Sequence, residues 1–167
     1  MSQGPQGTTP PAGATFPAIR RILVGVDFSP PSDKALALAV DLAKKLGAEL
    51  TLLHVYQIPA FAFPETIVPA PPETVDRLIN ENRKHLEQLA VSVRAQGVAA
   101  ATDLLPGSAF VELVGRARQG FDLVVVGTHG RTGLRHALLG SVAEKVVRKS
   151  PVPVLTVRGD DHTFEPL

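Results

Sequence analysis

The segment VVVGTHGRTGLRHALLGSVAEKVV, residues Val124–Val147, passes from an apolar run through a glycine-rich loop into an amphipathic stretch that starts at Gly140 and Ser141. This order is typical of a buried parallel strand connected to a crossover helix. Glycine lets backbone N–H groups approach an anion, and the first turn of a helix adds unpaired donors and a partial positive charge. Ser141 can either cap that helix or bond an anion. The segment therefore predicts a strand–loop–helix unit that binds an anionic group such as a phosphate.

Strand and helix patterns also alternate on the N-terminal side of this segment. Arg20–Asp27 is a short apolar run that predicts a strand, and Ser29 followed by Pro30 predicts a capped helix start. Apolar residues at helical spacing continue as far as Gly47, where we expect the helix to end. Ala48–Tyr56 then predicts a second buried strand, so the series begins with a β-α-β unit.

The remaining patterns complete an alternating series. A long amphipathic helix is expected to end before Gly97, and its apolar face consists of Val75, Leu78, Ile79, Leu86, Leu89, Ala90 and Val93. The elements expected after it are a strand at Val98–Leu105, a helix at Ser108–Arg118, a strand at Phe121–Val126, a helix at Ser141–Lys149 and a strand at Val152–Val157. This alternation predicts a doubly wound α/β domain with a five-stranded parallel sheet and helices on both faces. Pro153 has no N–H for a ladder, so we expect the last strand at an edge.

The segment Gln57–Pro72 departs from this series. It contains five prolines, which exclude a helix. It also contains the apolar residues Phe61, Phe63, Ile67 and Val68. These are unusual in a solvated linker, and two interpretations remain open: a lid or partner surface, and a loop that packs over a helix face.

The composition excludes several classes of protein and site. The chain has 167 residues, a formal net charge of +1, one Tyr and no Trp, which argues against nucleic-acid binding. It has no cysteine, which removes disulfides, thiol catalysis and cysteine-ligated zinc. No apolar run reaches the roughly 18 residues of a membrane-spanning helix, and the N-terminus lacks a signal-peptide pattern. We therefore expect no membrane association and a cytoplasmic location.

The two ends of the chain differ from the region between them. Residues 1–18 are rich in Gly, Pro and Thr and carry no charged side chain, so they predict a flexible N-terminal tail. We expect one folded domain at residues 19–159, followed by a short C-terminal tail at residues 160–167.

The glycine spacing resembles the ATP-binding signature of the universal stress protein family. Two residues separate Gly127 from Gly130, and nine residues separate Gly130 from Gly140 and Ser141. Neither a Walker A motif nor a GxGxxG motif is present. The resemblance covers residues 20–158 and implies an adenine nucleotide alpha hydrolase-like fold with strand order 3-2-1-4-5. It also implies a homodimer that forms through the edge strand Val152–Val157.

The resemblance, carried over residue by residue, implies a two-part ATP site. The nucleoside would be bordered by Gly25, Val26, Asp27 and Val55, and the phosphates by Gly127, Gly130, Gly140, Ser141 and Val142. Within the glycine motif, His129 is a further candidate for contact with phosphate or ribose, and Arg131 for neutralising phosphate charge. Asp27 and the glycines have a simpler interpretation as turn residues. No metal-ligand pattern is present, so Mg²⁺ or Mn²⁺ would be held mainly by the nucleotide oxygens.

Three function classes follow from these observations. The first is an ATP-binding stress-response protein that acts as a nucleotide-dependent switch or partner-binding module. The second is a slow ATPase, and the third is a dimeric scaffold with a vestigial nucleotide site. From Gly120 to Leu139 the one acidic residue is Asp122, inside a predicted strand, so we expect no catalytic residue and little turnover. The sequence identifies no protein partner.

Overall fold

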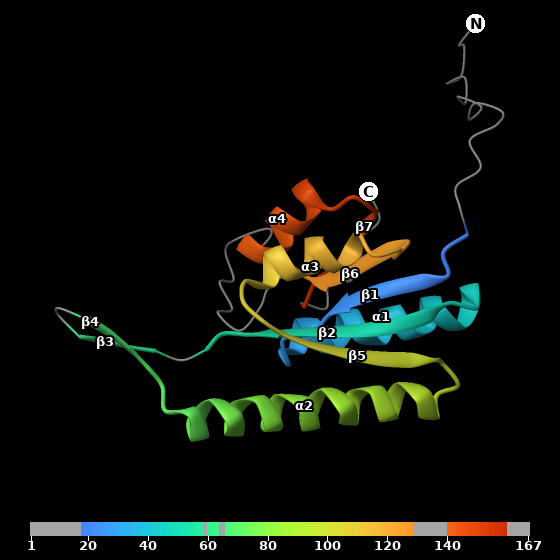
Figure 1. The fold of residues 1–167 in the computed structure, drawn as a ribbon. Coiled ribbons are helices and arrows are strands. Elements are labelled where there is room, and N and C mark those ends of the chain that lie inside the picture. Colours follow the sequence, from blue (N-terminus) through green and yellow to red (C-terminus); the bar gives the residue numbers. More distant parts are fainter. Residues whose placement is uncertain (1–17, 59, 64–65, 129–139, 160–167) are drawn as a thin grey trace, which may run out of the picture.

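Five parallel strands form one sheet in the order β5-β2-β1-β6-β7 (Figure 1). They are β1 (Arg21–Gly25), β2 (Glu49–Tyr56), β5 (Ala100–Pro106), β6 (Leu123–Gly127) and β7 (Val154–Val157). This computed structural model describes residues 18–58, 60–63, 66–128 and 140–159. Strands β3 and β4 belong to a separate hairpin, so the main-sheet strands counted along the chain have the predicted order 3-2-1-4-5. The predicted fold class is confirmed, with β7 at an edge.

Strand β1 lies between β2 and β6 at the centre of the sheet. Ile22 is in register with Leu50 of β2 and with Leu123 of β6. The side chains of Ile22, Leu23 and Val24 are fully buried. A strand with helices over both faces of its sheet must be apolar at every position, which explains the uninterrupted apolar run.

The four helices divide the core into two layers. They are α1 (Pro30–Leu46), α2 (Pro72–Ala95), α3 (Ala109–Ala117) and α4 (Ser141–Lys149). Buried residues of α1 and α2 form one cluster with Ile22, Val24 and Leu52, whereas α3 and α4 form the other with Leu23 and Leu53. Successive strand side chains therefore point to opposite faces. Figure 1 shows α2 on one side of the sheet and α3 and α4 on the other.

Helix α1 begins and ends at the predicted residues. Ser29 has an extended backbone, its side chain accepts a hydrogen bond from the Ser32 N–H, and Pro30 follows it. Gly47 ends the helix with a left-handed φ of 65°. This backbone conformation is strained for a residue that has a Cβ, so glycine suits the position.

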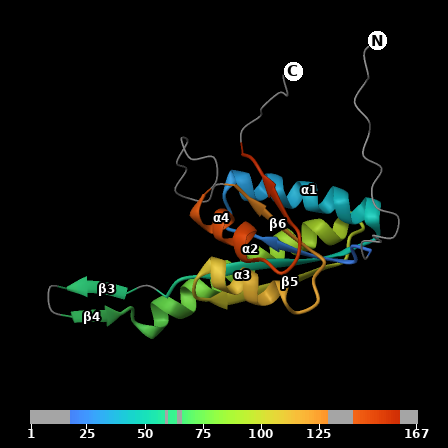
Figure 2. The ribbon, with the colours of Figure 1, turned by 90° about the horizontal axis from the view of Figure 1, so that it is seen from above.

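The proline-rich segment contains an antiparallel hairpin, which was not predicted. Strands β3 (Ala60–Phe63) and β4 (Thr66–Pro69) pair with each other and with no strand of the main sheet. The hairpin extends away from the sheet and its helices, so it is not a loop packed over a helix face (Figure 2). The prolines flank or end the two short strands instead of interrupting them, which leaves the pairing intact.

None of the described helices combines sufficient length with sufficient apolar character to cross a bilayer.

Asp122 ties the amino ends of β1 and β6 together. One oxygen of its carboxylate accepts hydrogen bonds from the backbone N–H groups of Arg20 at 2.8 Å and Arg21 at 2.9 Å. Its own N–H donates to the Arg21 carbonyl at 2.9 Å. The two backbone hydrogen bonds, helped by the charges of both arginines, hold the pKa of Asp122 below its usual value.

We predict that Asp122→Asn lowers the stability of the fold by an amount that depends on pH. A carboxyl whose pKa is lowered in the folded state stabilises the protein above its unfolded pKa, and this contribution is lost as pH falls through the folded pKa. The difference in unfolding midpoint between wild type and variant should be largest at pH 7. It should shrink below about pH 4, because the ordinary pKa of an Asp carboxyl is 3.8. Urea unfolding at a series of pH values measures it.

The matched control is Asp41→Asn on the exposed side of α1, which should change the midpoint little at any pH. A gap between wild type and Asp122→Asn that stays constant down to pH 3 would contradict the role given to the carboxylate.

Candidate functional site

A cavity of about 570 Å³ opens at the carboxyl edge of the sheet. Its walls come from the ends of β1, β2 and β6, the first turns of α3 and α4, and the N-terminal half of α2. The strand order reverses between β1 and β6, and open α/β sheets bind their ligands at such a reversal. The volume falls within the ~300–1,000 Å³ typical of small-molecule sites.

Most of the predicted site residues line this cavity. Those that do are Gly25, Val26, Asp27, Val55, Gly127, Gly140, Ser141 and Val142. The fold therefore brings together residues from β1, β2, β6 and α4 that are far apart in the sequence. His129, Gly130 and Arg131 lie outside the described residues. The binding roles of all these residues remain predictions.

Asp27 follows β1 and shapes the turn into α1. Its carboxylate accepts a hydrogen bond from the Ser29 N–H at 3.0 Å and another from the Ser29 hydroxyl. Its own N–H donates to the Ser32 hydroxyl at 3.2 Å. The simple interpretation of Asp27 as a turn residue therefore holds, but Asp27 also lines the cavity. A carboxylate has several acceptor positions, so one residue can do both.

Phe28 and His54 hold the ends of β1 and β2 together beneath this turn. Phe28 has a φ of 61°, which is rare for a bulky side chain and usually marks a constrained position. Its ring lies 4.4 Å from the ring of His54, whose Nδ1 is 2.7 Å from the Val26 carbonyl oxygen. His54 is 3% exposed. It is a hydrogen-bonded core histidine that also lines the cavity.

Gly127 is required by the close approach of β6 to α1. A Cβ at this position would lie 3.0 Å from the backbone carbon and oxygen of Pro31 and 3.1 Å from the Ser32 nitrogen. At Gly25, a Cβ would lie 3.0 Å from the Val126 side chain. Both glycines therefore serve the packing between elements, and for Gly127 this reason differs from the turn role considered in the sequence. They let the backbone of β1 and β6 form the floor of the cavity.

The loop between β6 and α4 is anchored at both of its described ends. The Gly140 N–H donates to the Thr128 carbonyl at 2.6 Å, and the Thr128 N–H donates to the Val157 carbonyl at 2.8 Å. Gly140 is the N-cap of α4 and Ser141 is its first helical residue, so of the two roles left open for Ser141 the capping role is excluded. The N–H groups of Ser141 and the next residues have no acceptor within the helix. They lie at the cavity wall, where the positive end of the helix dipole favours an anion.

The charges around the cavity are uneven. Among the described lining residues Asp27 is the one acidic side chain, and none is Lys or Arg. An anionic ligand would therefore be attracted mainly by the first turn of α4. In the part of the chain that the structure describes, no three His, Asp or Glu residues group closely enough to bind a metal ion.

Sequence reasoning missed the walls that α2 and α3 contribute. The additional lining residues include Ser32, Tyr56, Leu78, Asn82, Gly107 and Leu113. One signal was available: Asn82 interrupts the apolar face of α2 four residues after Leu78 and four before Leu86. The other residues look like ordinary core or turn positions in the sequence.

We predict that Gly127→Ala destabilises the protein by about 1–3 kcal/mol, because backbone atoms of α1 would have to move away from the new methyl group. Thermal and urea unfolding measure the change. Gly115→Ala in α3 is the matched control, since a Cβ there meets nothing within 4 Å. In the interior of a helix that substitution should stabilise by roughly 0.5–1 kcal/mol. Equal effects of the two substitutions would contradict the packing role of Gly127.

The matching family model, one relative and two solved structures that this chain resembles all belong to one family. The model of the universal stress protein family matches residues 18–158. The universal stress protein YxiE of Bacillus subtilis is 38% identical over 145 residues, which cover 83% of this chain and 98% of that protein. The structure of universal stress protein UspA from Lactobacillus plantarum is 26% identical, with a TM-score of 0.73, over 85% of this chain and 99% of that one. A universal stress protein crystallised in complex with cAMP is also 26% identical, with a TM-score of 0.64, over 86% of this chain and all of that one.

Proposed function

Because the chain belongs to the universal stress protein family, we propose that it is a stress-response regulator that binds an adenine nucleotide, ATP in the first place, in the cavity at the sheet edge. The observation that carries this proposal is the convergence of β1, β2, β6 and the first turn of α4 on one cavity at the strand-order reversal. The cAMP complex of a relative supports the adenine nucleotide class. We further propose that the protein acts in the cytoplasm.

In this proposal the nucleoside lies at the ends of β1 and β2. Gly25 and Val26 leave room for it, Asp27 accepts a hydrogen bond from a ribose hydroxyl, and Val55 contacts the base. Val55 packs with the apolar cluster under α3, so this wall suits an uncharged ring. The carboxylate of Asp27 would repel phosphate groups, which assigns the nucleoside to this end of the cavity.

The phosphates lie at the opposite end, against Gly127 and the start of α4. Gly140, Ser141 and Val142 present backbone N–H groups, and the loop residues His129, Gly130 and Arg131 complete the site. Phosphates attract Mg²⁺ or Mn²⁺, which would be held mainly by phosphate oxygens. A charged ligand bound between the end of β6 and the start of α4 would bridge these two elements, and this supports a role as a nucleotide-dependent switch.

We propose that binding occurs with little or no hydrolysis. Asp122 lies at the amino end of the sheet and is bonded to Arg20 and Arg21, so it is remote from the cavity. Asp27 is engaged by Ser29 on the nucleoside side. Among the described lining residues, no acidic side chain other than Asp27 is available to orient a water molecule toward a γ-phosphate.

The phosphate position is tested by Ser141→Pro. Pro suits the first helical position, and Gly140 before it has the extended backbone, φ −69° and ψ 154°, that a residue preceding Pro adopts. The substitution removes one N–H from the first turn of α4 while keeping the helix. We expect the affinity for Mg-ATP to fall about tenfold, because one hydrogen bond to a charged group is lost. Isothermal titration calorimetry of the purified chain measures it.

Ser141→Ala separates the hydroxyl from the backbone N–H. A small loss in Ser141→Ala beside a large loss in Ser141→Pro supports the amide contact, whereas equal losses would assign the effect to the hydroxyl. Unchanged ATP affinity in Ser141→Pro would contradict the placement of the phosphates at this helix. Absence of ATP binding to the wild type would contradict the proposed function.

We also propose a homodimer that forms through residues Val152–Val157, of which Val154–Val157 are the edge strand β7. The carbonyl of Pro153 accepts a hydrogen bond from Val124 of β6, and that of Val157 accepts one from Thr128 just after β6. Backbone direction alternates along a strand, so the N–H and C=O groups of Val154 and Thr156 point to the open edge. Such an edge pairs readily with a second copy across a two-fold axis.

Thr156→Pro tests this interface, since it removes an outward N–H and leaves the ladder with β6 in place. We expect light scattering to show a dimer for the wild type and a shift toward monomer for the variant. Thr156→Val keeps the N–H and a similar shape, and it should remain dimeric. A dimer that persists in Thr156→Pro would move the interface elsewhere.

A further inference from the structure

We propose that Asn82 of α2 recognises the edge of the nucleotide base and selects adenine over guanine. The inference rests on the proposed function, since it concerns the same cavity. It adds a residue from a helix that the glycine motif does not include.

The first argument is the position of Asn82 on α2. The apolar face of this helix contains Leu78, Leu86 and Ala90 at steps of four residues, and Asn82 occupies the one polar position in that row. Leu86 and Ala90 are buried, and Asn82 is half-buried. The amide atoms are not buried, so the side chain adds nothing to the apolar packing of this face and remains accessible from the cavity.

No hydrogen bond from the Asn82 side chain to another described residue is present, although Asn80 two residues earlier accepts one from Arg83. Asn82 and Leu78 line the cavity. The amide therefore lies where a bound molecule is available as its partner.

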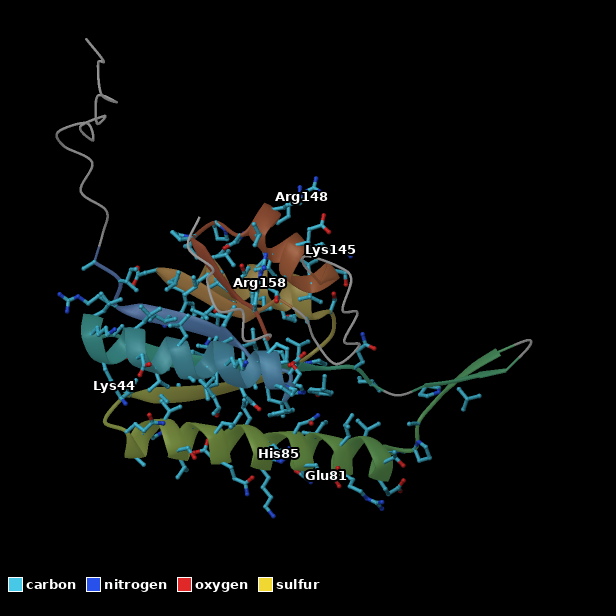
Figure 3. All side chains as sticks on the ribbon, turned by 180° about the vertical axis from the view of Figure 1, so that it is seen from behind. Lys44, Glu81, His85, Lys145, Arg148 and Arg158 are labelled. Atoms are coloured by element: carbon cyan, nitrogen blue, oxygen red, sulfur yellow. The ribbon has the colours of Figure 1, made fainter. Side chains whose placement is uncertain are left out.

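The second argument is that the cavity extends onto the α2 side of the sheet. Along β2, Leu53 and Val55 pack with the cluster of α3 and α4, so His54 and Tyr56 lie on the opposite face. The ring of Phe28 lies 4.4 Å from that of His54 and 5.1 Å from that of His85 on α2. Figure 3 labels His85 on α2. His85 is three residues after Asn82, so helical geometry puts the two on one face of the helix. This face of α2 borders the end of β2, where the base is proposed to lie.

The third argument is the chemistry of the two sides of the base site. The lining residues from the start of α3, which are Gly107, Ala109 and Leu113, offer no side-chain hydrogen-bonding group. Asn82 offers a donor and an acceptor on one planar amide. Adenine presents a matching donor and acceptor at N6 and N7, whereas guanine presents two acceptors at O6 and N7. An amide that pairs with both adenine atoms therefore discriminates against guanine.

The test compares Asn82→Leu with the matched control Asn80→Leu on the exposed side of the same helix. Mg-ATP and Mg-GTP are titrated into each full-length protein by calorimetry, and the emission of Tyr56, the one tyrosine of the chain, gives a second readout of the cavity. We expect Asn82→Leu to bind ATP about tenfold more weakly with little change for GTP. Its unfolding midpoint should not fall, because Leu continues the apolar face. Asn80→Leu should keep the ratio of ATP to GTP affinity.

Asn82→Asp provides an independent variant that retains a polar side chain. Asp keeps the acceptor for the adenine N6 group but loses the donor to N7, so we expect Asn82→Asp to bind ATP more weakly than the wild type while still rejecting GTP, whose O6 and N7 are both acceptors. Asn80→Asp controls for the added charge. An unchanged ratio of the two affinities in Asn82→Leu together with an unchanged ATP affinity in Asn82→Asp, with ATP bound by the wild type, would overturn this inference and leave the proposed function standing. Failure of the wild type to bind either nucleotide would overturn both.

Discussion

The parallel pairing of β1 with both β2 and β6 is the constraint on which the rest of the molecule depends. It places β1 at the centre of the sheet, where Ile22, Leu23 and Val24 are fully buried. The chain leaves β1 toward the face of α1 and leaves β6 toward the face of α4, so the ends of these neighbouring strands diverge. The cavity lies at this divergence. Gly127 lets the start of α1 lie against β6 beside the cavity, because no Cβ stands between them.

The sequence predicted the sheet because its signals were local and mutually consistent. Ser29, Pro30 and Gly47 bound α1 through caps and a left-handed turn that depend only on neighbouring residues. Strand β1 is apolar at consecutive positions because both its faces are covered, and this pattern is visible without the structure. The parts of the candidate site on β1, β6 and α4 lie at the ends of strands and at the start of a helix. They could therefore be placed from the sequence once the strand order was predicted.

The remaining features depend on contacts between distant segments. Nothing near Gly127 in the sequence shows that Pro31 lies against it, so its packing role was hidden. The hairpin of β3 and β4 was missed because its prolines suggested irregular structure, although they lie outside or at the ends of the paired residues. Asn82 was a local signal that was overlooked: a polar residue on an apolar face is often where function overrides folding preference.

Thr128 connects two parts of the protein through its own peptide groups. Its carbonyl accepts from Gly140 at the start of α4, and its N–H donates to Val157 at the end of β7. A shift of the β6–α4 connection would therefore be felt directly by the outermost strand. If the proposed nucleotide and the proposed dimer contact each act on their own side of Thr128, thermodynamic reciprocity makes the effect of binding on self-association equal to the effect of self-association on binding.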